Sequence, residues 1–300
     1  EGPPDPPRMT PEPAALDLCS RDGGPLRVWD YGGGGPPLLF CHCAGTLGRV
    51  WEPVIRRLDA RWRVYALDFR GHGDSLKPED RRAHQWASYA GDVEDAARQL
   101  SFGPGAAAIG HSGGGVAVAL NLIHHPELFS RAALLDAILA PSWFFPEEMP
   151  LAHGARRRKM VFSSAEEAAG RLGAKAPYVH WHPEARAAFL AHGLEPMAGG
   201  RVKLKCPGHL EAFFYECGSS EGTLHALEGV HVPVLCVAGG ESYMLEHVRE
   251  QHRRLPCGEL AVIPGGTHFF PQEKPEETAR ALNNWFAATD DAQSASKSNT

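Results

Sequence analysis

The chain has 300 residues, of which 43% are hydrophobic and 22% charged, with a formal net charge of -6 and a pI near 6.2. This composition is typical of a globular protein with one large domain, or with a core that carries an insertion. The mild acidity gives no electrostatic reason to expect nucleic acid or an anionic membrane as a partner. The basic run "RRRK" at 156–159 is too short to change this, and we interpret it as a solvated helix face.

Both ends of the sequence have the composition of disordered segments. Residues 1–20 are rich in proline and acidic side chains at their start, and residues 289–300 form a small polar tail. The first residues lack the order of a signal peptide, and no stretch reaches the roughly 18 to 20 apolar residues that a membrane span needs. We therefore expect a cytoplasmic protein. The sequence begins with Glu1 rather than Met, which is compatible with a removed upstream targeting segment.

The cysteine and glycine clusters predict neither a metal site nor a nucleotide site. Seven cysteines, most of them in apolar runs, favour buried thiols in a reducing compartment. On a strand, Cys41 and Cys43 of "CHC" point away from His42, and no second ligand cluster follows at finger-like spacing. The run "YGGGGPP" at 31–37 lacks the Lys and Ser or Thr of a phosphate loop. We expect no metal and no cofactor.

In chain order, short apolar runs predict strands at 26–31, 36–43, 62–69, 106–112, 131–139, 232–240 and 258–266. Helical patterns alternate with them at 49–60, 87–100, 115–125, 246–255 and 275–288. Apolar strands alternating with helices predict an α/β fold, with a mostly parallel central sheet flanked by helices. In such sheets, ligands bind at the loops beyond the carboxyl ends of the strands.

One connection is much longer than the others. Residues 141–230 separate two predicted strands and are rich in histidine, tryptophan and phenylalanine, as in "PSWFFPEEMP" and "LEAFFYECG". Aromatic side chains at this density do not stay solvated, so we predict a helical lid inserted into a core made of residues 21–140 and 231–288. The clusters "SWFF" and "EAFF" indicate either an apolar substrate site or burial of the lid on the core.

The stretch "IGHSGGG" at 109–115 lies where a predicted strand turns into a predicted helix. Its Gly-x-Ser-x-Gly pattern is that of a nucleophile elbow, which holds a serine hydroxyl clear of the sheet. Glycines at 110 and 114 remove side chains that would collide with the strand and the helix. We therefore predict Ser112 as a nucleophile and the amide of Gly113 as the first donor of an oxyanion site.

A serine hydroxyl needs a base to take its proton, and the base needs an acid to hold its tautomer. His268 is the predicted base because it lies between the last predicted strand and the last helix. In many folds of this type, the acid is an aspartate that follows the seventh strand, but after strand 232–240 the turn reads "GGES", with Ser242 in that place. We assign the acid to Asp136, at the end of strand 131–139, with Glu241 as the alternate. A carboxylate in such an apolar run needs a cationic or N–H partner.

The loop after strand 36–43 supplies the second oxyanion donor in this interpretation. The amide of Ala44 is the first candidate and Cys43 is next in line. Two further histidines lie close to the predicted site. His111 adjoins the nucleophile and is interpreted as a packing residue, while His72 in "DFRGHGDS" is interpreted as bracing its own loop.

With these motifs in place, residues 25–288 resemble the α/β-hydrolase superfamily. The resemblance rests on "FCHCAGTLGRVWEPV", "YALDFRGHGDS", "IGHSGGGVAVAL", "HHPELFSRAALLDAI", "VPVLCVAGGES" and "IPGGTHFFPQEKPEETARALNNW". The lid motif "HWHPEA" together with "GGES" is similar to a poorly characterised bacterial and fungal subgroup, in which an acid after the sixth strand fits Asp136. The chain departs from the family at His42-Cys43, where His-Gly is usual.

The resemblance implies a hydrolase and leaves its substrate open. The first hypothesis is a serine esterase that cleaves a small or medium apolar carboxylic ester through an acyl-enzyme. A second keeps the same triad for acyl transfer, thioester cleavage or C–C hydrolysis, which product analysis with added alcohols or thiols would separate. A third is a non-catalytic ligand receptor on this fold, which fast turnover of simple esters would exclude. The oligomeric state stays open.

Overall fold

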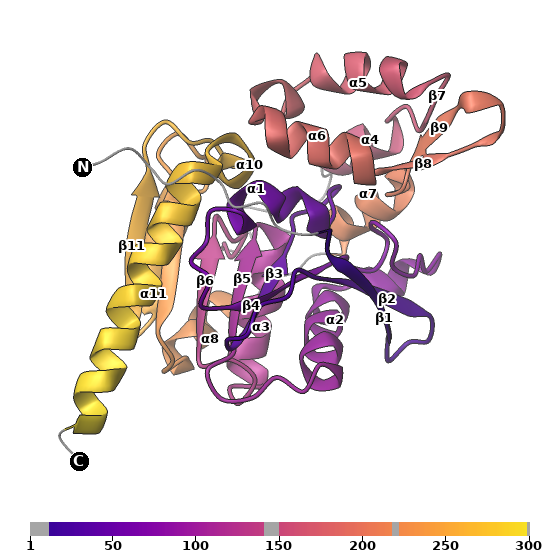
Figure 1. The fold of residues 1–300 in the computed structure, drawn as a ribbon. Coiled ribbons are helices and arrows are strands. Elements are labelled where there is room, and N and C mark those ends of the chain that lie inside the picture. The colour runs from indigo at the N-terminus through magenta and orange to yellow at the C-terminus, as the bar shows by residue number, and fades with distance from the viewer. Residues whose placement is uncertain (1–11, 141–149, 218–221, 299–300) are drawn as a thin grey trace.

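The computed structural model describes residues 12–140, 150–217 and 222–298 (Figure 1). Its main sheet has eight strands in the order β1-β2-β4-β3-β5-β6-β10-β11. These strands are β1 (Ala14–Cys19), β2 (Pro25–Asp30), β3 (Pro37–Cys41), β4 (Arg63–Leu67), β5 (Ala107–His111), β6 (Arg131–Leu135), β10 (Val234–Gly239) and β11 (Gly258–Ile263). The strands from β4 to β11 in this order pair parallel, whereas β2 pairs antiparallel with both β1 and β4.

Helices cover both faces of the sheet. The α-helices of the described residues are α1 (Glu52–Ile55), α2 (Trp86–Gln99), α3 (Gly113–His124), α4 (Pro150–Arg156), α5 (Ala165–Gly173), α6 (Pro183–His192), α7 (Gly208–Glu216), α8 (Thr223–Ala226), α9 (Leu245–Arg254), α10 (Phe270–Glu273) and α11 (Pro275–Ser298). Helices α2, α3 and α9 pack on one face, against side chains such as Leu39 and Leu134. Helices α1 and α11 cover the other face, where Phe40 and Ile109 point (Figure 1). All seven predicted strands are present.

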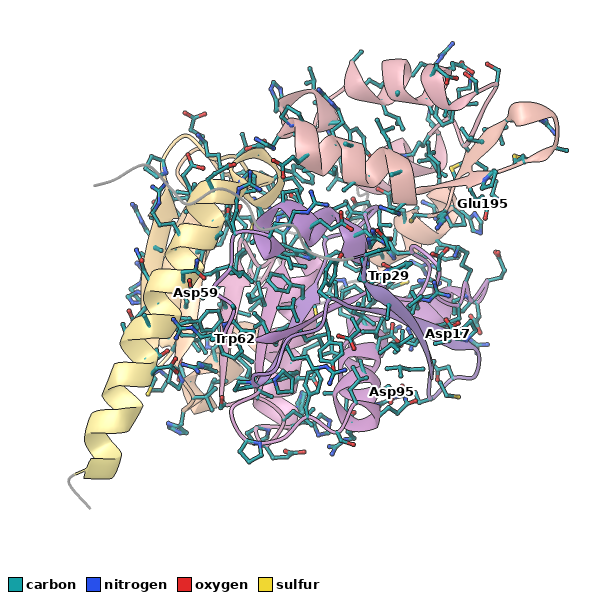
Figure 2. The ribbon with its side chains drawn as sticks, in the orientation of Figure 1. Asp17, Trp29, Asp59, Trp62, Asp95 and Glu195 are labelled. Carbon is teal, nitrogen blue, oxygen red and sulfur yellow. The ribbon has the colours of Figure 1, made fainter. Side chains whose placement is uncertain are left out.

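The predicted disordered arm at residues 1–20 is wrong for its described end. Residues 14–19 form β1, which pairs antiparallel along the whole of β2, and Asp17 on its exposed side binds Arg27 at 3.0 Å (Figure 2). The strand escaped sequence analysis because it lies at the edge of the sheet and four of its six residues are exposed. An edge strand of this kind lacks the apolar run that marks the central strands.

The predicted disordered tail at 289–300 is also wrong over its described part, because α11 continues to Ser298. Its inner face packs on the sheet through Phe286, whose ring centroid is 4.6 Å from that of Trp62 (Figure 2). Thr289 continues this buried face, since its hydroxyl accepts a hydrogen bond from Arg131 at 2.6 Å. Tertiary contacts therefore stabilise the start of a segment whose composition alone favours disorder.

The long connection between β6 and β10 carries α4 to α8 and a separate sheet of three short strands. These strands are β7 (Val161–Phe162), β8 (Leu194–Pro196) and β9 (Val202–Leu204), in the order β7-β9-β8. Sequence analysis predicted helices here and missed this sheet. The insertion stands at the end of the core beside α1, at the top right of Figure 1, and α6 packs on α1. Residues 141–149, with the predicted cluster "SWFF", lie outside the described residues.

The structure also bears on two expectations from composition, the lack of a membrane span and the buried thiols. Among the described residues, no helix is both long and apolar enough to cross a membrane. The seven cysteines all carry free thiols, and four of them are buried: Cys41, Cys43, Cys206 and Cys236.

Candidate active site

Ser112 occupies the turn between β5 and α3 in a strained backbone conformation. Its φ of 58° and ψ of -121° are unusual for a residue with a side chain. The conformation is held by its neighbours, because its N–H donates to the carbonyl of Leu135 at 2.9 Å. A Cβ on Gly110 would lie 2.4 Å from the Gly114 carbonyl oxygen, and one on Gly114 would lie 2.5 Å from the Cys41 carbonyl oxygen. Only glycine fits at these two positions, as the motif predicts.

The structure brings three of the predicted site residues into one hydrogen-bonded chain. The Ser112 hydroxyl oxygen lies 3.0 Å from His268 Nε2. On the other side of the ring, His268 Nδ1 lies 3.1 Å from Asp136 Oδ2. A carboxylate can only accept, so Nδ1 carries a proton and donates it to Asp136. Nε2 of the neutral ring is then free to accept the proton of the Ser112 hydroxyl, which is the arrangement that base catalysis requires.

Asp136 is completely buried and has its own set of donors. Its Oδ1 accepts the backbone N–H of Gly239 at 3.2 Å, and its Oδ2 accepts a hydrogen bond from the Ser242 hydroxyl. The N–H partner expected for a carboxylate in this apolar run is therefore present. Asp136 also has a positive φ of 43°. Asp136 and Ser112 are two of the three non-glycine residues with positive φ among those that the structure describes. Such strain is concentrated at functional sites.

Glu241, the alternate acid, is not part of this chain. Its side chain is exposed and lies near Gly265 and Lys274, on the outer side of the loop. Its backbone N–H donates to the carbonyl of Gly266 at 2.9 Å, which fixes the loop in that orientation. Of the two carboxylates considered from sequence, the geometry thus favours Asp136.

The predicted oxyanion residues lie on two elements beside Ser112. Gly113 begins α3, where the first N–H groups of a helix have no acceptor within the helix. Ala44 lies half-buried in the turn after β3. In that turn, Gly45 N–H donates to His72 Nε2 at 3.0 Å, and His72 Nδ1 in turn donates to the carbonyl of Arg70 at 2.9 Å. His72 therefore braces the loop of Ala44 as well as its own.

His42 has a similar role one residue before Cys43. Its Nδ1 lies 2.7 Å from the Cys43 carbonyl oxygen, and its Nε2 accepts the N–H of Phe69 at 3.1 Å. The Cys43 thiol lies 3.5 Å from the hydroxyl of Thr46. This thiol stands where the family usually has glycine, and burial raises its pKa to about 12, so that it stays protonated at neutral pH.

His111 supports the position of His268, a role that sequence analysis missed. It is fully buried, and its Nε2 lies 2.7 Å from the carbonyl oxygen of His268, to which it donates. The two rings lie 5.2 Å apart. The sequence signal for this contact was the adjacency of His111 to Ser112. That adjacency places its ring on the opposite face of the strand from the nucleophile, where the His268 loop passes.

The insertion contacts the core close to the site. The ring of Phe214 on α7 lies so close to Gly113 that a Cβ at position 113 would be 2.0 Å from its Cζ atom. Phe214 is buried, and its ring centroid lies 4.7 Å from that of Tyr89 in α2. Of the two alternatives for the cluster "EAFF", Phe214 therefore fits burial of the insertion on the core.

An ion pair lies beside the loop that follows β3. Glu211 on α7 contacts Arg158 through both carboxylate oxygens, at 2.9 Å and 2.7 Å, and a Cβ on Gly45 would lie 2.6 Å from Glu211 Oε1. Burial raises the pKa of the Glu211 carboxyl, while Arg158 opposes that shift. Arg158 also lines a small pocket together with Gly45, Thr46 and Lys205. The basic run at 156–159 is thus not wholly a solvated face, because Arg158 turns inward.

A family model described as the alpha/beta hydrolase family matches residues 38–281. The chain belongs to this family. The match spans the strand before the oxyanion loop, the elbow, the insertion and the loop of His268. The eight-stranded, mostly parallel sheet with helices on both faces agrees with this assignment. The fold class expected from the sequence is confirmed.

Individual relatives of this alpha/beta hydrolase are enzymes of bacterial origin. The 2-(acetamidomethylene)succinate hydrolase of Mesorhizobium japonicum is 27% identical over 260 residues, which cover 85% of this chain and 90% of the relative. The (E)-2-((N-methylformamido)methylene)succinate hydrolase of Acinetobacter baylyi is 24% identical over 86% of this chain and 92% of its own. A crystal structure of E-2-(acetamidomethylene)succinate hydrolase superposes with a TM-score of 0.78, at 24% identity over 92% of this chain and 99% of that one.

The buried histidines predict a loss of stability in acid. Burial lowers the pKa of His42, His72 and His111 below the usual 6.5, most strongly for the last two. Each stays neutral in the folded protein at a pH where the unfolded chain binds a proton, so stability is present above pH 6.5 and is lost as the pH falls. We expect the free energy of unfolding to decrease by up to about 1.4 kcal/mol per pH unit for each histidine.

Urea denaturation at a series of pH values between about 7.5 and 5.5 measures this slope. The variant His72→Gln is the matched control, because its amide oxygen can still accept the Gly45 N–H but the side chain does not titrate. We expect a shallower slope for this variant than for the natural chain. Equal slopes would show that His72 does not contribute.

Proposed function

We propose that this alpha/beta hydrolase is a serine-dependent hydrolase that cleaves a carboxylic ester of a small or medium apolar substrate. The observation that carries the proposal is the chain from Ser112 Oγ to His268 Nε2 at 3.0 Å and from His268 Nδ1 to Asp136 Oδ2 at 3.1 Å. This order of hydroxyl, imidazole and carboxylate is that of a catalytic triad. The strained elbow and the buried acid support the same interpretation.

In the proposed reaction, the Ser112 oxygen attacks the acyl carbon while His268 Nε2 takes the hydroxyl proton. The negative charge that develops on the carbonyl oxygen is stabilised by the amides of Gly113 and Ala44. His268 then gives its proton to the leaving alcohol, and the acyl group stays on Ser112. Water, deprotonated by His268, attacks the acyl-enzyme and releases the acid and the free serine. Asp136 stabilises the imidazolium in both halves of the reaction.

A second candidate keeps the same triad and cleaves the amide bond of a substrate that carries carboxylates. Two relatives that match most of the chain are hydrolases of amidomethylene succinates, which contain both groups. The pocket beside Gly45 has two cationic side chains in its wall, Arg158 and Lys205. A guanidinium has five N–H donors, so Arg158 can bind a substrate carboxylate in addition to Glu211.

The nucleophile is tested with a fluorophosphonate probe, which reacts with activated serines. We expect the probe to label Ser112 in the natural chain and not in Ser112→Ala, with peptide mapping by mass spectrometry to locate the adduct. Ser130 has a hydroxyl bound to the Ala106 carbonyl, and Ser130→Ala is the control that leaves labelling intact. A folded protein that the probe does not label would contradict the proposal.

The acid is tested by comparing Asp136→Asn with Glu241→Gln. An asparagine at 136 cannot stabilise the imidazolium and favours the wrong tautomer, so we expect kcat to fall by about four orders of magnitude. Glu241 points away from His268, so Glu241→Gln should retain the natural rate. Rates are measured with p-nitrophenyl esters. The reverse pattern of losses would reassign the acid to Glu241.

The two substrate classes are separated by a pair of esters with the same chain length, one neutral and one ending in a free carboxylate. The ester proposal expects a preference for the neutral compound, and Arg158→Met should affect both compounds alike. The second candidate expects a preference for the carboxylate and a selective rise of its KM in Arg158→Met. Arg158→Met/Glu211→Gln is the control, because it leaves no unpaired buried carboxylate at Glu211.

A further inference from the structure

We propose that Tyr243 lines the leaving-group side of the candidate site and favours substrates whose leaving alcohol carries an aromatic group. This role rests on the proposed function, because it takes Ser112 as the nucleophile and His268 as the base. It narrows the proposed apolar ester at one part of its structure, the alcohol that leaves first. Tyr243 lies in the turn between β10 and α9.

Three aromatic rings among the described residues approach the imidazole of His268, and they differ in exposure. The ring of Tyr243 lies 4.9 Å from the imidazole, centroid to centroid, at an interplanar angle of 34°. The rings of His111 and Phe269 each lie 5.2 Å from it. His111 is fully buried and Phe269 is half-buried, whereas Tyr243 is 58% exposed. Of these three rings, Tyr243 is therefore the one that a molecule arriving from solvent can reach first.

The backbone holds Tyr243 in place from both sides. Ser242 is nearly buried, and its N–H donates to the carbonyl of Gly239 at 3.1 Å. Met244 is fully buried, and its N–H donates to the Ser242 hydroxyl at 3.0 Å. Burial of the hydroxyl raises the pKa of Tyr243, and the charge of Asp136 adds to this shift. The hydroxyl end is thus close to protein, while the ring is exposed. A side chain fixed in this way loses little freedom when a ligand packs on it.

The proposed reaction brings the leaving group close to this ring. His268 Nε2, which lies 3.0 Å from the Ser112 oxygen, gives its proton to the leaving alcohol. Such a transfer requires the leaving oxygen to lie within roughly 3 Å of Nε2. The group bound to that oxygen therefore starts beside an imidazole whose exposed neighbour is Tyr243. An aromatic group there can stack on Tyr243, or meet it edge to face, more favourably than a saturated group of the same size.

The first test uses a benzyl ester and a cyclohexylmethyl ester of the same acid. Their alcohols are similar in size and acidity, so the two compounds differ mainly in the aromatic ring. We expect the natural chain to prefer the benzyl ester in kcat/KM, and Tyr243→Leu to lower this preference by about three- to tenfold. Tyr243→Phe retains the ring and should retain the preference. Equal losses for both esters in Tyr243→Leu would overturn the role of Tyr243.

Leu260→Ala is the matched control for this comparison. It removes another exposed apolar side chain, in the middle of the edge strand β11. We expect it to leave the preference for the benzyl ester unchanged.

The second test separates contact with the leaving group from support of His268, because loss of the ring can also act through the imidazole. Two phosphonate probes that place the same group on Ser112 are compared, one that loses fluoride and one that loses p-nitrophenolate. In Tyr243→Leu, the labelling rate of the aryl probe relative to that of the fluoride probe should fall by about three- to tenfold. An equal fall for both probes would show that the ring only holds His268, and would overturn the leaving-group role.

A wrong assignment of Tyr243 is distinguishable from failure of the proposed function. If neither probe labels Ser112 in the natural chain, the nucleophile is wrong and the role of Tyr243 is lost with it. If both probes label Ser112 and Tyr243→Leu has the same two ratios as the natural chain, only the assignment of Tyr243 is wrong. If both ratios fall in Tyr243→Leu and Tyr243→Phe retains them, the leaving-group role is supported.

Discussion

The close approach of α3 to the carboxyl ends of β3 and β5 is the constraint on which the site depends. At Gly114 a side chain would collide with the carbonyls of Cys41 and His42, and at Gly110 with the first turn of the helix itself. Because glycine has no Cβ at these two positions, the chain can turn from strand to helix within one residue. Ser112 occupies that turn in the strained conformation. The hydroxyl then lies at the rim of the sheet, where the loops after β6 and β11 bring Asp136 and His268 to it.

Neutral histidines hold the loops of this rim in place. His42 and His72 each donate from one ring nitrogen to a carbonyl and accept a backbone N–H with the other. His111 donates to the carbonyl of His268 itself. Rings such as those of His42 and His72 stabilise a single loop conformation because both of their nitrogens are paired, and an unpaired donor or acceptor in the core is costly. The geometry of the proposed site thus depends on side chains outside the hydrogen-bonded chain of Ser112, His268 and Asp136.

The order of hydroxyl, imidazole and carboxylate supports the proposed acyl transfer, and the same order suits several kinds of scissile bond. The proposed triad is compatible with an ester, an amide or a thioester as substrate, because all three would pass through a tetrahedral intermediate at Ser112. The insertion between β6 and β10 lies beside the proposed site. There Phe214 is buried against the core next to Gly113, and Arg158 places a charge beside Gly45.

The sequence by itself determined the alternation of strands and helices, and it was enough to predict the elbow at Ser112 and a base at His268. Each of these is local, since a short apolar run, a glycine spacing or a position after the last strand is enough to recognise it. Sequence did not reveal β1 or the end of α11, because both are stabilised by partners far along the chain rather than by their own composition. It also left the acid open between Asp136 and Glu241. Only the tertiary structure distinguished them, because the register of β6 against β10 decides which carboxylate lies beside His268.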